Sequence, residues 1–158
     1  MRFTVLCVGK MKEKYLLEAC DEYIKRLSRF AKTDIIEIAD EKIPDKASEK
    51  QENQIKERES AAVLAKIPSG SFVVALCIEG GMMSSEKLAQ TIEKVAMQYS
   101  HIVFLIGGSL GLSDSVKRRA DLQLSFSPMT FPHRIMRVIL LEQIYRACKI
   151  NANEAYHK

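Results

Sequence analysis

The feature that most limits how this 158-residue chain can fold is its alternation of short apolar runs with longer amphipathic segments. Short apolar runs bounded by turn residues are typical of buried strands, and apolar positions repeating every three or four residues are typical of helices. The pattern predicts strands at residues 3–8, 34–38, 72–78, 102–106 and 122–126. Helices are expected at residues 13–30, 48–65 and 133–149, with two more beginning near Ser84 and Ser113. This order predicts an α/β fold, a single domain over residues 1–158 with a mostly parallel sheet and helices on both faces.

Three segments of unusual composition follow predicted strands. They are residues 76–81, which include Gly80 and Gly81, the glycine-rich residues 107–111 and the proline-containing residues 127–132. In parallel sheets, ligands bind beyond the carboxyl ends of the strands. We therefore expect the three segments to meet at one edge of the sheet and to form a ligand site there, with Gly80 and Gly81 turning the chain into the next helix.

The segment 127–132 has the sequence SPMTFP and contains two prolines but no glycine. Proline fixes φ, lacks an N–H group and keeps the preceding residue out of the helical region. The loop should therefore be stiff and extended, with backbone groups that cannot pair with one another and are available to a ligand. A rigid surface connection explains the same residues equally well.

The glycine-rich loop Gly107–Gly111 invites comparison with a dinucleotide phosphate loop. It follows the fourth predicted strand and not the first, and residues 122–141 contain no acid to bind a ribose. A P-loop sequence is absent. Glu79 is the only acid at the expected ligand edge, so a hydrolase is poorly supported. The glycines can also be explained by close backbone packing in a tight turn.

Charge, cysteine and hydropathy patterns limit the partners. Residues 1–116 contain 16 basic and 17 acidic residues, whereas residues 117–158 contain 8 and 3, which leaves a basic C-terminal part that suits a polyanion. The four cysteines are far apart, without metal-ligand spacing, so we expect reduced thiols and no metal. No apolar run is long enough to cross a membrane and no signal peptide is recognised, which predicts a cytoplasmic protein.

The sequence resembles the RlmH family, the small methyltransferases of the SPOUT superfamily that methylate N3 of a pseudouridine in 23S ribosomal RNA. The resemblance rests on VLCVGKMKEKY near the N-terminus, the IGGSLG loop, the block SFSPMTFPHRIMRVILLEQIYRA and the terminal EAYHK. It runs from end to end, and the SFSPMTFPH block and the terminal YHK are its most specific parts.

The resemblance implies a deep trefoil knot in the C-terminal part of the sheet, which holds the methyl donor S-adenosylmethionine. Donor-binding positions carried over from the family are Leu76, Gly108, Ser127, Pro128, Met129, Thr130, Phe131 and Pro132. We expect Gly108 to allow close approach of the donor, so that a side chain there would intrude on the ligand. The resemblance further implies a homodimer acting on the assembled ribosome, with no metal, membrane or DNA partner.

The imide nitrogen of the acceptor must lose a proton, so a base near the methyl group would help. We predict that His157 takes this part and that Tyr156 contacts the uracil ring; His133, beside the proline loop, is the alternative base. Arg134, Arg137 and Lys158 are expected to bind RNA phosphates.

The expected helix 133–149 carries a broad apolar band, which we interpret as a dimer surface, and Glu142 and Arg146 are spaced to pair on it. Two other functions fit parts of the pattern. One is a non-enzymatic RNA- or ribosome-associated protein, and the other is a different nucleotide-binding doubly wound enzyme.

Overall fold

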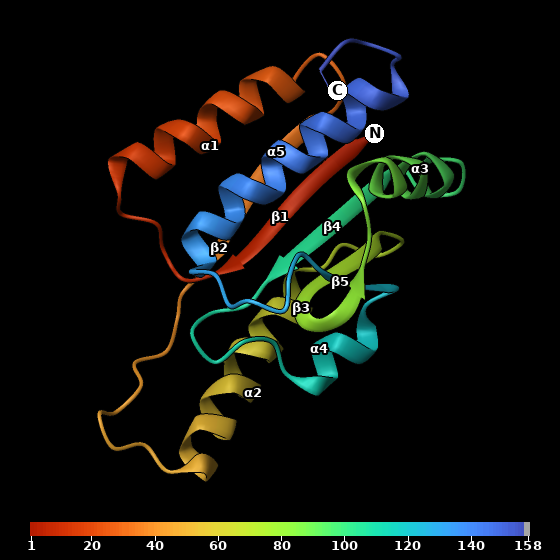
Figure 1. Cartoon of the computed structure of the whole chain (residues 1–158). Helices are drawn as coiled ribbons and strands as arrows, with labels where there is room; N and C mark the ends of the chain where they lie inside the picture. Colours follow the sequence, from red (N-terminus) through yellow and green to blue (C-terminus); the bar gives the residue numbers. More distant parts are fainter. Residues whose placement is uncertain (157–158) are drawn as a thin grey trace.

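The computed structural model describes residues 1–156 and confirms the α/β class with a parallel sheet (Figure 1). Five strands lie in the order β2-β1-β4-β3-β5, and every neighbouring pair is parallel. Their bounds are β1 (Arg2–Val8), β2 (Lys32–Ile38), β3 (Phe72–Met82), β4 (His101–Ile106) and β5 (Leu122–Ser125).

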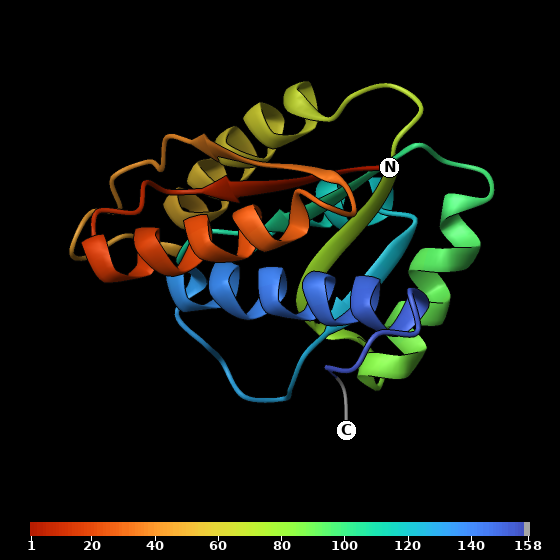
Figure 2. The same ribbon diagram turned by 90° about the horizontal axis from the view of Figure 1, so that it is seen from above.

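Helices cover both faces of the sheet, as predicted. They are α1 (Lys14–Leu27), α2 (Glu49–Lys66), α3 (Ser85–Ala96), α4 (Asp114–Arg119) and α5 (His133–Asn151). Helices α1, α3 and α5 lie on one face, while α2 and α4 lie on the other (Figure 2). The N-terminal part of α2 and the loop before it project away from the sheet (Figure 1).

Two apolar cores, one on each face, explain why the strands are continuously apolar. In β1, Phe3, Val5 and Cys7 pack into one core. Leu6 and Val8 pack into the other. A strand buried on both faces needs apolar residues at every position rather than at alternate ones.

Serine caps begin three of the helices where the sequence predicts them. The Ser48 side chain accepts a hydrogen bond from the Gln51 N–H, while the Gln51 side chain accepts from the Ser48 N–H, which completes the capping box of α2. The caps of α3 and α4 use a single hydrogen bond each. The Ser84 side chain accepts from the Lys87 N–H, and the Ser113 side chain accepts from the Val116 N–H.

The expectation that Gly80 and Gly81 turn the chain is wrong, because β3 continues through them to Met82. A register shift between Leu76 and Gly81 lets the strand resume pairing with β5. A Cβ atom on Gly80 would lie 2.8 Å from backbone atoms of Gln123 and Leu124. The glycine therefore permits a close approach of two strands where a turn was expected.

After β5, at the edge of the sheet, residues 126–132 carry the chain back across the molecule to α5 (Figures 1 and 2). Helix α5 then packs against both α1 and α3. The Tyr145 ring, for example, lies 6.2 Å from that of Phe30 and 6.3 Å from that of Tyr23. Much of the broad apolar band of α5 is thus covered within one chain, which weakens it as an argument for a dimer. The trefoil knot stays a prediction from the resemblance.

Candidate functional site

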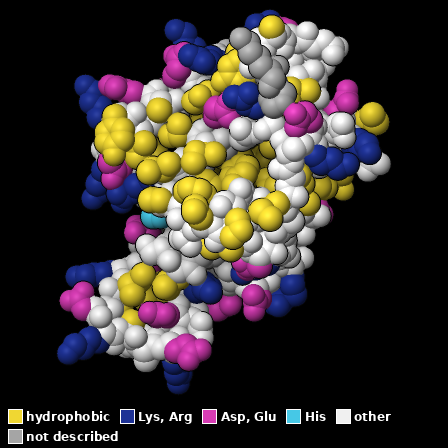
Figure 3. Space-filling view, viewed as in Figure 1, with side chains coloured by type: hydrophobic (Ala, Val, Ile, Leu, Met, Phe, Trp, Pro, Cys, Tyr) yellow, Lys and Arg dark blue, Asp and Glu magenta, His cyan; other side chains and the backbone are white. Residues whose placement is uncertain are grey.

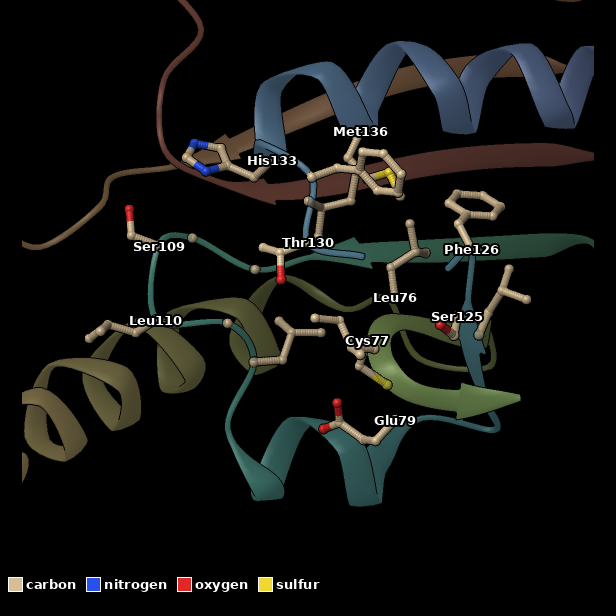
Figure 4. A pocket seen from close by; sticks show the side chains of 18 of the residues that line it. Leu76, Cys77, Glu79, Ser109, Leu110, Ser125, Phe126, Thr130, His133 and Met136 are labelled. Carbon is tan, nitrogen blue, oxygen red and sulfur yellow. The ribbon is translucent and has the colours of Figure 1, made fainter. Parts of the chain in front are cut away.

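A cavity of about 360 Å³ lies at the carboxyl edge of the sheet, where the sequence predicts a ligand site. It is formed by the end of β3, the glycine loop after β4 and the loop between β5 and α5 (Figure 4). Its volume is within the usual range for small-molecule sites. The prediction that the three segments converge is therefore confirmed.

Most of the residues predicted to bind the donor line this cavity: Leu76, Gly108, Ser127, Met129, Thr130 and Phe131. Pro128 and Pro132 do not line it. They lie within and at the end of the same loop, and none of the described peptide bonds, theirs included, is cis. Any effect of the two prolines on the cavity is therefore indirect, through the shape of the loop.

Few hydrogen bonds within the chain use the backbone of the proline loop. The Ser125 hydroxyl donates to the Ser127 carbonyl at 3.1 Å, and the Met129 N–H donates to the Ser127 hydroxyl at 3.0 Å. Within residues 1–156, the backbone N–H groups of Thr130 and Phe131 have no hydrogen-bond partner. Both residues line the cavity, so their N–H groups are donors that a ligand can use.

The glycine loop is compact because its backbone turns back on itself, leaving no room for a side chain at Gly107. Gly111 adopts a φ of +76°, and its N–H donates to the Gly108 carbonyl at 3.0 Å. A Cβ atom on Gly107 would lie 2.6 Å from the carbonyl carbon of Gly111, so no other residue fits without moving the loop.

The reason for glycine at position 108 differs from the one expected. A Cβ atom there would lie 3.1 Å from the Val8 side chain and 3.8 Å from the Glu59 carboxylate. Both neighbours belong to the protein, and both are buried. A side chain at position 108 would therefore press on the core beneath the loop, and either Val8 or the loop that borders the cavity would have to move.

One side of the cavity is charged. Lys117 of α4 donates a hydrogen bond to Glu79 of β3, and both line the cavity together with Lys56 of α2. The Lys117 hydrogen bond lowers the pKa of the Glu79 carboxyl. Cys77, whose side chain also faces the cavity, has a thiol pKa raised chiefly by burial, so it stays protonated (Figure 4). Lys56 and Lys117 were not predicted as site residues, because nothing in their local sequence places them at the strand ends.

His133 begins α5 on the opposite side of the cavity from Glu79 (Figure 4). Burial lowers the pKa of its imidazole, and the positive charges of Arg137 and Arg134 lower it further, while Asp40 acts in the opposite direction. The ring is therefore neutral at pH 7. It packs against Gly9, where a Cβ atom would lie 3.3 Å from its Nε2.

The predicted phosphate-binding arginines both interact within the chain. Arg137 has a side chain that is only 1% exposed, donates to the Glu37 carboxylate at 2.9 Å and also donates to the Gly9 carbonyl. The expectation that Arg137 contacts RNA is corrected by this burial; the arginine ties α5 to the ends of β1 and β2. Arg134 is bound to Glu13 but remains 38% exposed.

The tail lies against α5, and Tyr156 does not line the cavity of its own chain. Its hydroxyl donates to the Glu142 carboxylate at 3.2 Å, and its ring packs on Tyr145 and under the Arg146 guanidinium. Burial, with Tyr23 and Glu142 nearby, raises the pKa of the phenol to about 12. The predicted pairing of Glu142 with Arg146 is confirmed at 2.6 Å. His157 and Lys158 lie outside the described residues.

No metal site or membrane span is found in the described part of the chain. Residues 1–156 contain no group of three or more metal-ligating side chains, and all four cysteines are free thiols. None of the helices among these residues is both long and apolar enough to span a bilayer.

Comparisons with known proteins agree with the fold and identify a family. The family model described as "Predicted SPOUT methyltransferase" matches residues 1–157. A protein of Bifidobacterium animalis subsp. lactis named "Ribosomal RNA large subunit methyltransferase H" is 59% identical over the full length of both chains. A protein of the same name from Clostridium novyi is 57% identical, again over both full lengths. A probable methylase family protein from Haemophilus influenzae has a similar structure, with a TM-score of 0.54 at 11% identity, over 99% of this chain and 70% of that one.

Proposed function

Because the chain belongs to the SPOUT methyltransferase family, we propose that it methylates N3 of a pseudouridine in 23S ribosomal RNA with S-adenosylmethionine as the donor. The observation that carries the proposal is full-length similarity to proteins named ribosomal RNA large subunit methyltransferase H. Those names support methyl transfer to large-subunit ribosomal RNA. The choice of a pseudouridine N3 comes from the sequence resemblance to the RlmH family.

The cavity fits the proposed donor in size and in chemistry. Adenine needs a flat apolar slot with hydrogen-bonding groups along its edge. Leu76 and Phe126 supply apolar walls, and the N–H groups of Thr130 and Phe131 supply donors within the same cavity. The donor itself supplies the electrophilic methyl group on a sulfonium, so no metal is needed to activate it.

The main task of the protein in such a displacement is alignment of the acceptor nitrogen with the methyl group. Alignment in a fixed site can lower a barrier by roughly 7–11 kcal/mol. The compact glycine loop and the proline loop suit this task, because sterically constrained backbone holds a bound ligand in one position.

We assign acceptor binding and proton removal to the tail, with Tyr156 against the uracil ring and His157 as the base. Tyr156 is bonded to Glu142, nine residues along α5 from His133 at the cavity. That separation is roughly 14 Å along the helix axis. Within one chain Tyr156 is therefore held away from the donor, which supports a homodimer in which one tail serves the partner's cavity.

Exposed apolar side chains beside the cavity also support a homodimer. Met129, Phe131 and Ile135 are 71%, 39% and 42% exposed, and hydrophobic side chains gather on the face that carries the proline loop (Figure 3). Apolar surface of this kind is typical of a protein interface. Arg134 and Lys158 remain the proposed contacts to RNA phosphates, and the cytoplasm, where ribosomes are found, the proposed compartment.

The proposal is tested by incubating the protein with ribosomes that lack the modification and with donor carrying a radioactive methyl group. We expect label in the large-subunit RNA in the presence of the full-length chain. A chain lacking residues 156–158 should bind S-adenosylmethionine with unchanged affinity but transfer far less label.

Other results would contradict the proposal. Ribosome binding without any transfer of label would identify a non-enzymatic ribosome-associated protein. Failure to bind S-adenosylmethionine, together with binding of a dinucleotide, would identify a different doubly wound enzyme. Equal transfer of label by the full-length and shortened chains would show that the tail is not needed for methyl transfer.

A further inference from the structure

The charged side of the donor cavity consists of Glu79, Lys117 and Lys56, which come from three different elements. Among the cavity-lining residues of the described chain, these three are the acidic and basic side chains, with His133 set apart across the cavity. The other lining residues are apolar, glycine, hydroxyl- or thiol-bearing, apart from the neutral His133 across the cavity (Figure 4). The cavity is therefore strongly polarised, with opposite charges on one side only.

Glu79 and Lys117 are held in place by the packing of their elements. Gly80, next to Glu79, is in close backbone contact with Gln123. The Gln123 side-chain amide in turn donates to the Lys117 carbonyl at 3.3 Å, and the Ser113 cap fixes the first turn of α4. The Lys117 side chain is only 21% exposed, so its ammonium is partly removed from water.

The ion pair leaves bonding capacity on both partners. A lysine ammonium has three N–H donors and a carboxylate can accept about four hydrogen bonds. The Lys117–Glu79 contact uses one donor and one acceptor position. Each group can therefore bind a ligand of the opposite charge while the pair stays formed.

S-adenosylmethionine ends in an α-amino acid, which carries an ammonium and a carboxylate on the same carbon. A zwitterion of this kind matches an anion and a cation that lie side by side. Resting on the function proposed above, we propose that Glu79 and Lys117 form the amino-acid subsite of the donor cavity. Glu79 accepts from the donor's ammonium, Lys117 binds its carboxylate, and Lys56 adds positive charge beside it.

The proposed subsite would determine which adenosine compounds the cavity binds tightly. The adenosine part of the donor occupies the apolar side, between Leu76 and the proline loop, and gains nothing from the ion pair. The pair therefore distinguishes a complete donor or its product from nucleosides that lack the amino acid. It also keeps the amino acid of the donor on the side of the cavity away from His133, which is the first residue of α5.

Calorimetric titration with two thioethers tests the subsite. S-adenosylhomocysteine has the amino acid, and 5′-methylthioadenosine has the same adenosine and sulfur without it. For Lys117→Met we expect the affinity for S-adenosylhomocysteine to fall about tenfold or more, the loss typical of a hydrogen bond to a charged group. The affinity for 5′-methylthioadenosine should change by less than about twofold, since that ligand makes no contact with the pair.

Two further variants complete the experiment. Arg118→Met removes the same charge from the neighbouring, exposed position of α4 and should leave both affinities unchanged. Glu79→Gln keeps the shape of the side chain and should lower only the affinity for S-adenosylhomocysteine. This second variant tests the subsite independently of any effect of Lys117→Met on folding.

The proposal is overturned if Lys117→Met and Glu79→Gln both leave the affinity for S-adenosylhomocysteine intact, or weaken both ligands equally. Either result, with tight binding to the unmodified protein, would leave the methyltransferase function standing. If the unmodified protein binds neither thioether, both the proposed function and the proposed subsite are contradicted.

Discussion

At the scale of single residues, the cavity depends on glycines whose neighbours are other parts of the protein. Gly107 and Gly80 each lie so close to neighbouring backbone that a Cβ atom would overlap with it. A glycine-rich sequence is readily interpreted as making room for a ligand, as we first interpreted Gly108. Here the glycines let the protein chain pack against itself, and the cavity results from that packing.

Replacing Gly108 by valine should weaken S-adenosylmethionine binding about fivefold or more. The new side chain would meet Val8 beneath the loop, and overpacking of this kind costs about 1–3 kcal/mol or displaces the backbone. Calorimetry gives the affinity. Gly81→Ala is the matched control, because the nearest atom to its Cβ is 4.0 Å away. Normal donor affinity in Gly108→Val would show that the glycine loop takes no part in donor binding.

His133 should make the protein less stable as the pH falls. Its pKa is lowered in the folded state by burial and by Arg137 and Arg134, so the unfolded chain binds the proton at a higher pH. The free energy of unfolding therefore decreases as the pH drops below about 6.5, the usual pKa of histidine. The lowered pKa of His101 contributes in the same direction.

The contribution of His133 is isolated by urea unfolding of the wild type and of His133→Gln at pH 7.5 and 5.5. The loss of stability between the two pH values should be smaller in the variant. An identical loss in both proteins would show that His133 takes up its proton as easily in the folded state as in the unfolded one.

Residue roles were the least predictable part of the site. The resemblance supplied the donor-binding positions, and most of them do line the cavity. Arg137 was expected to contact RNA because it is one of the basic residues near the proline loop. Only the folded structure reveals that Arg137 is buried, with its guanidinium bonded to the Glu37 carboxylate and the Gly9 carbonyl. Long-range pairs of this kind leave no local pattern in a sequence.

At the scale of elements, helix starts could be predicted well because caps are local. Ser48, Ser84 and Ser113 each bond a backbone N–H three residues later, and each begins a helix. The end of β3 could not be predicted in the same way. Two consecutive glycines favour a turn, but their contact with the backbone of β5, some forty residues later, keeps them in a strand.

The proline loop is the element whose stiffness we expect to matter most to the proposed donor. Pro128 and Pro132 do not line the cavity, so replacing both by glycine removes no contact with a ligand. It increases the freedom of the unbound loop, which costs about 0.4–1 kcal/mol for each residue. For the two residues together we expect donor affinity to fall by about four- to thirtyfold, with little change in the circular dichroism spectrum.

Pro68→Gly is the control for the proline pair, since Pro68 lies in the connection from α2 to β3 and does not line the cavity. It should leave donor affinity unchanged. If the double variant at 128 and 132 binds the donor as tightly as the wild type, the loop is only a connector and its rigidity has no part in the site.

At the scale of the whole molecule, the alternation of strands and helices predicted the class of fold but not its connectivity. Periodicity shows that β3 is buried, yet not that it lies between β4 and β5. General topological rules would even argue against a knot, because true knots are essentially absent from most folds. The resemblance is the only ground for expecting a knot, which stays a prediction.

The homodimer is the whole-molecule prediction on which the tail depends. Sedimentation at micromolar concentration should give twice the 17.9 kDa mass of one chain. The exposed apolar residues of the proline loop should lie in the interface, so Phe131→Asp should shift the equilibrium toward monomer. A wild-type chain that sediments as a monomer, yet is fully active, would require the tail to reach the cavity of its own chain.

The central claim is that this chain places a methyl group on N3 of a pseudouridine in the large-subunit RNA of the ribosome. The most direct measurement is mass spectrometry of nucleosides from ribosomes incubated with the protein, with and without S-adenosylmethionine. We predict that a methylated pseudouridine, identified as the N3 isomer by its fragments, appears only when both protein and donor are present. Unmethylated RNA after incubation with a protein that demonstrably binds the donor, or a methyl group on another nucleoside, would contradict it.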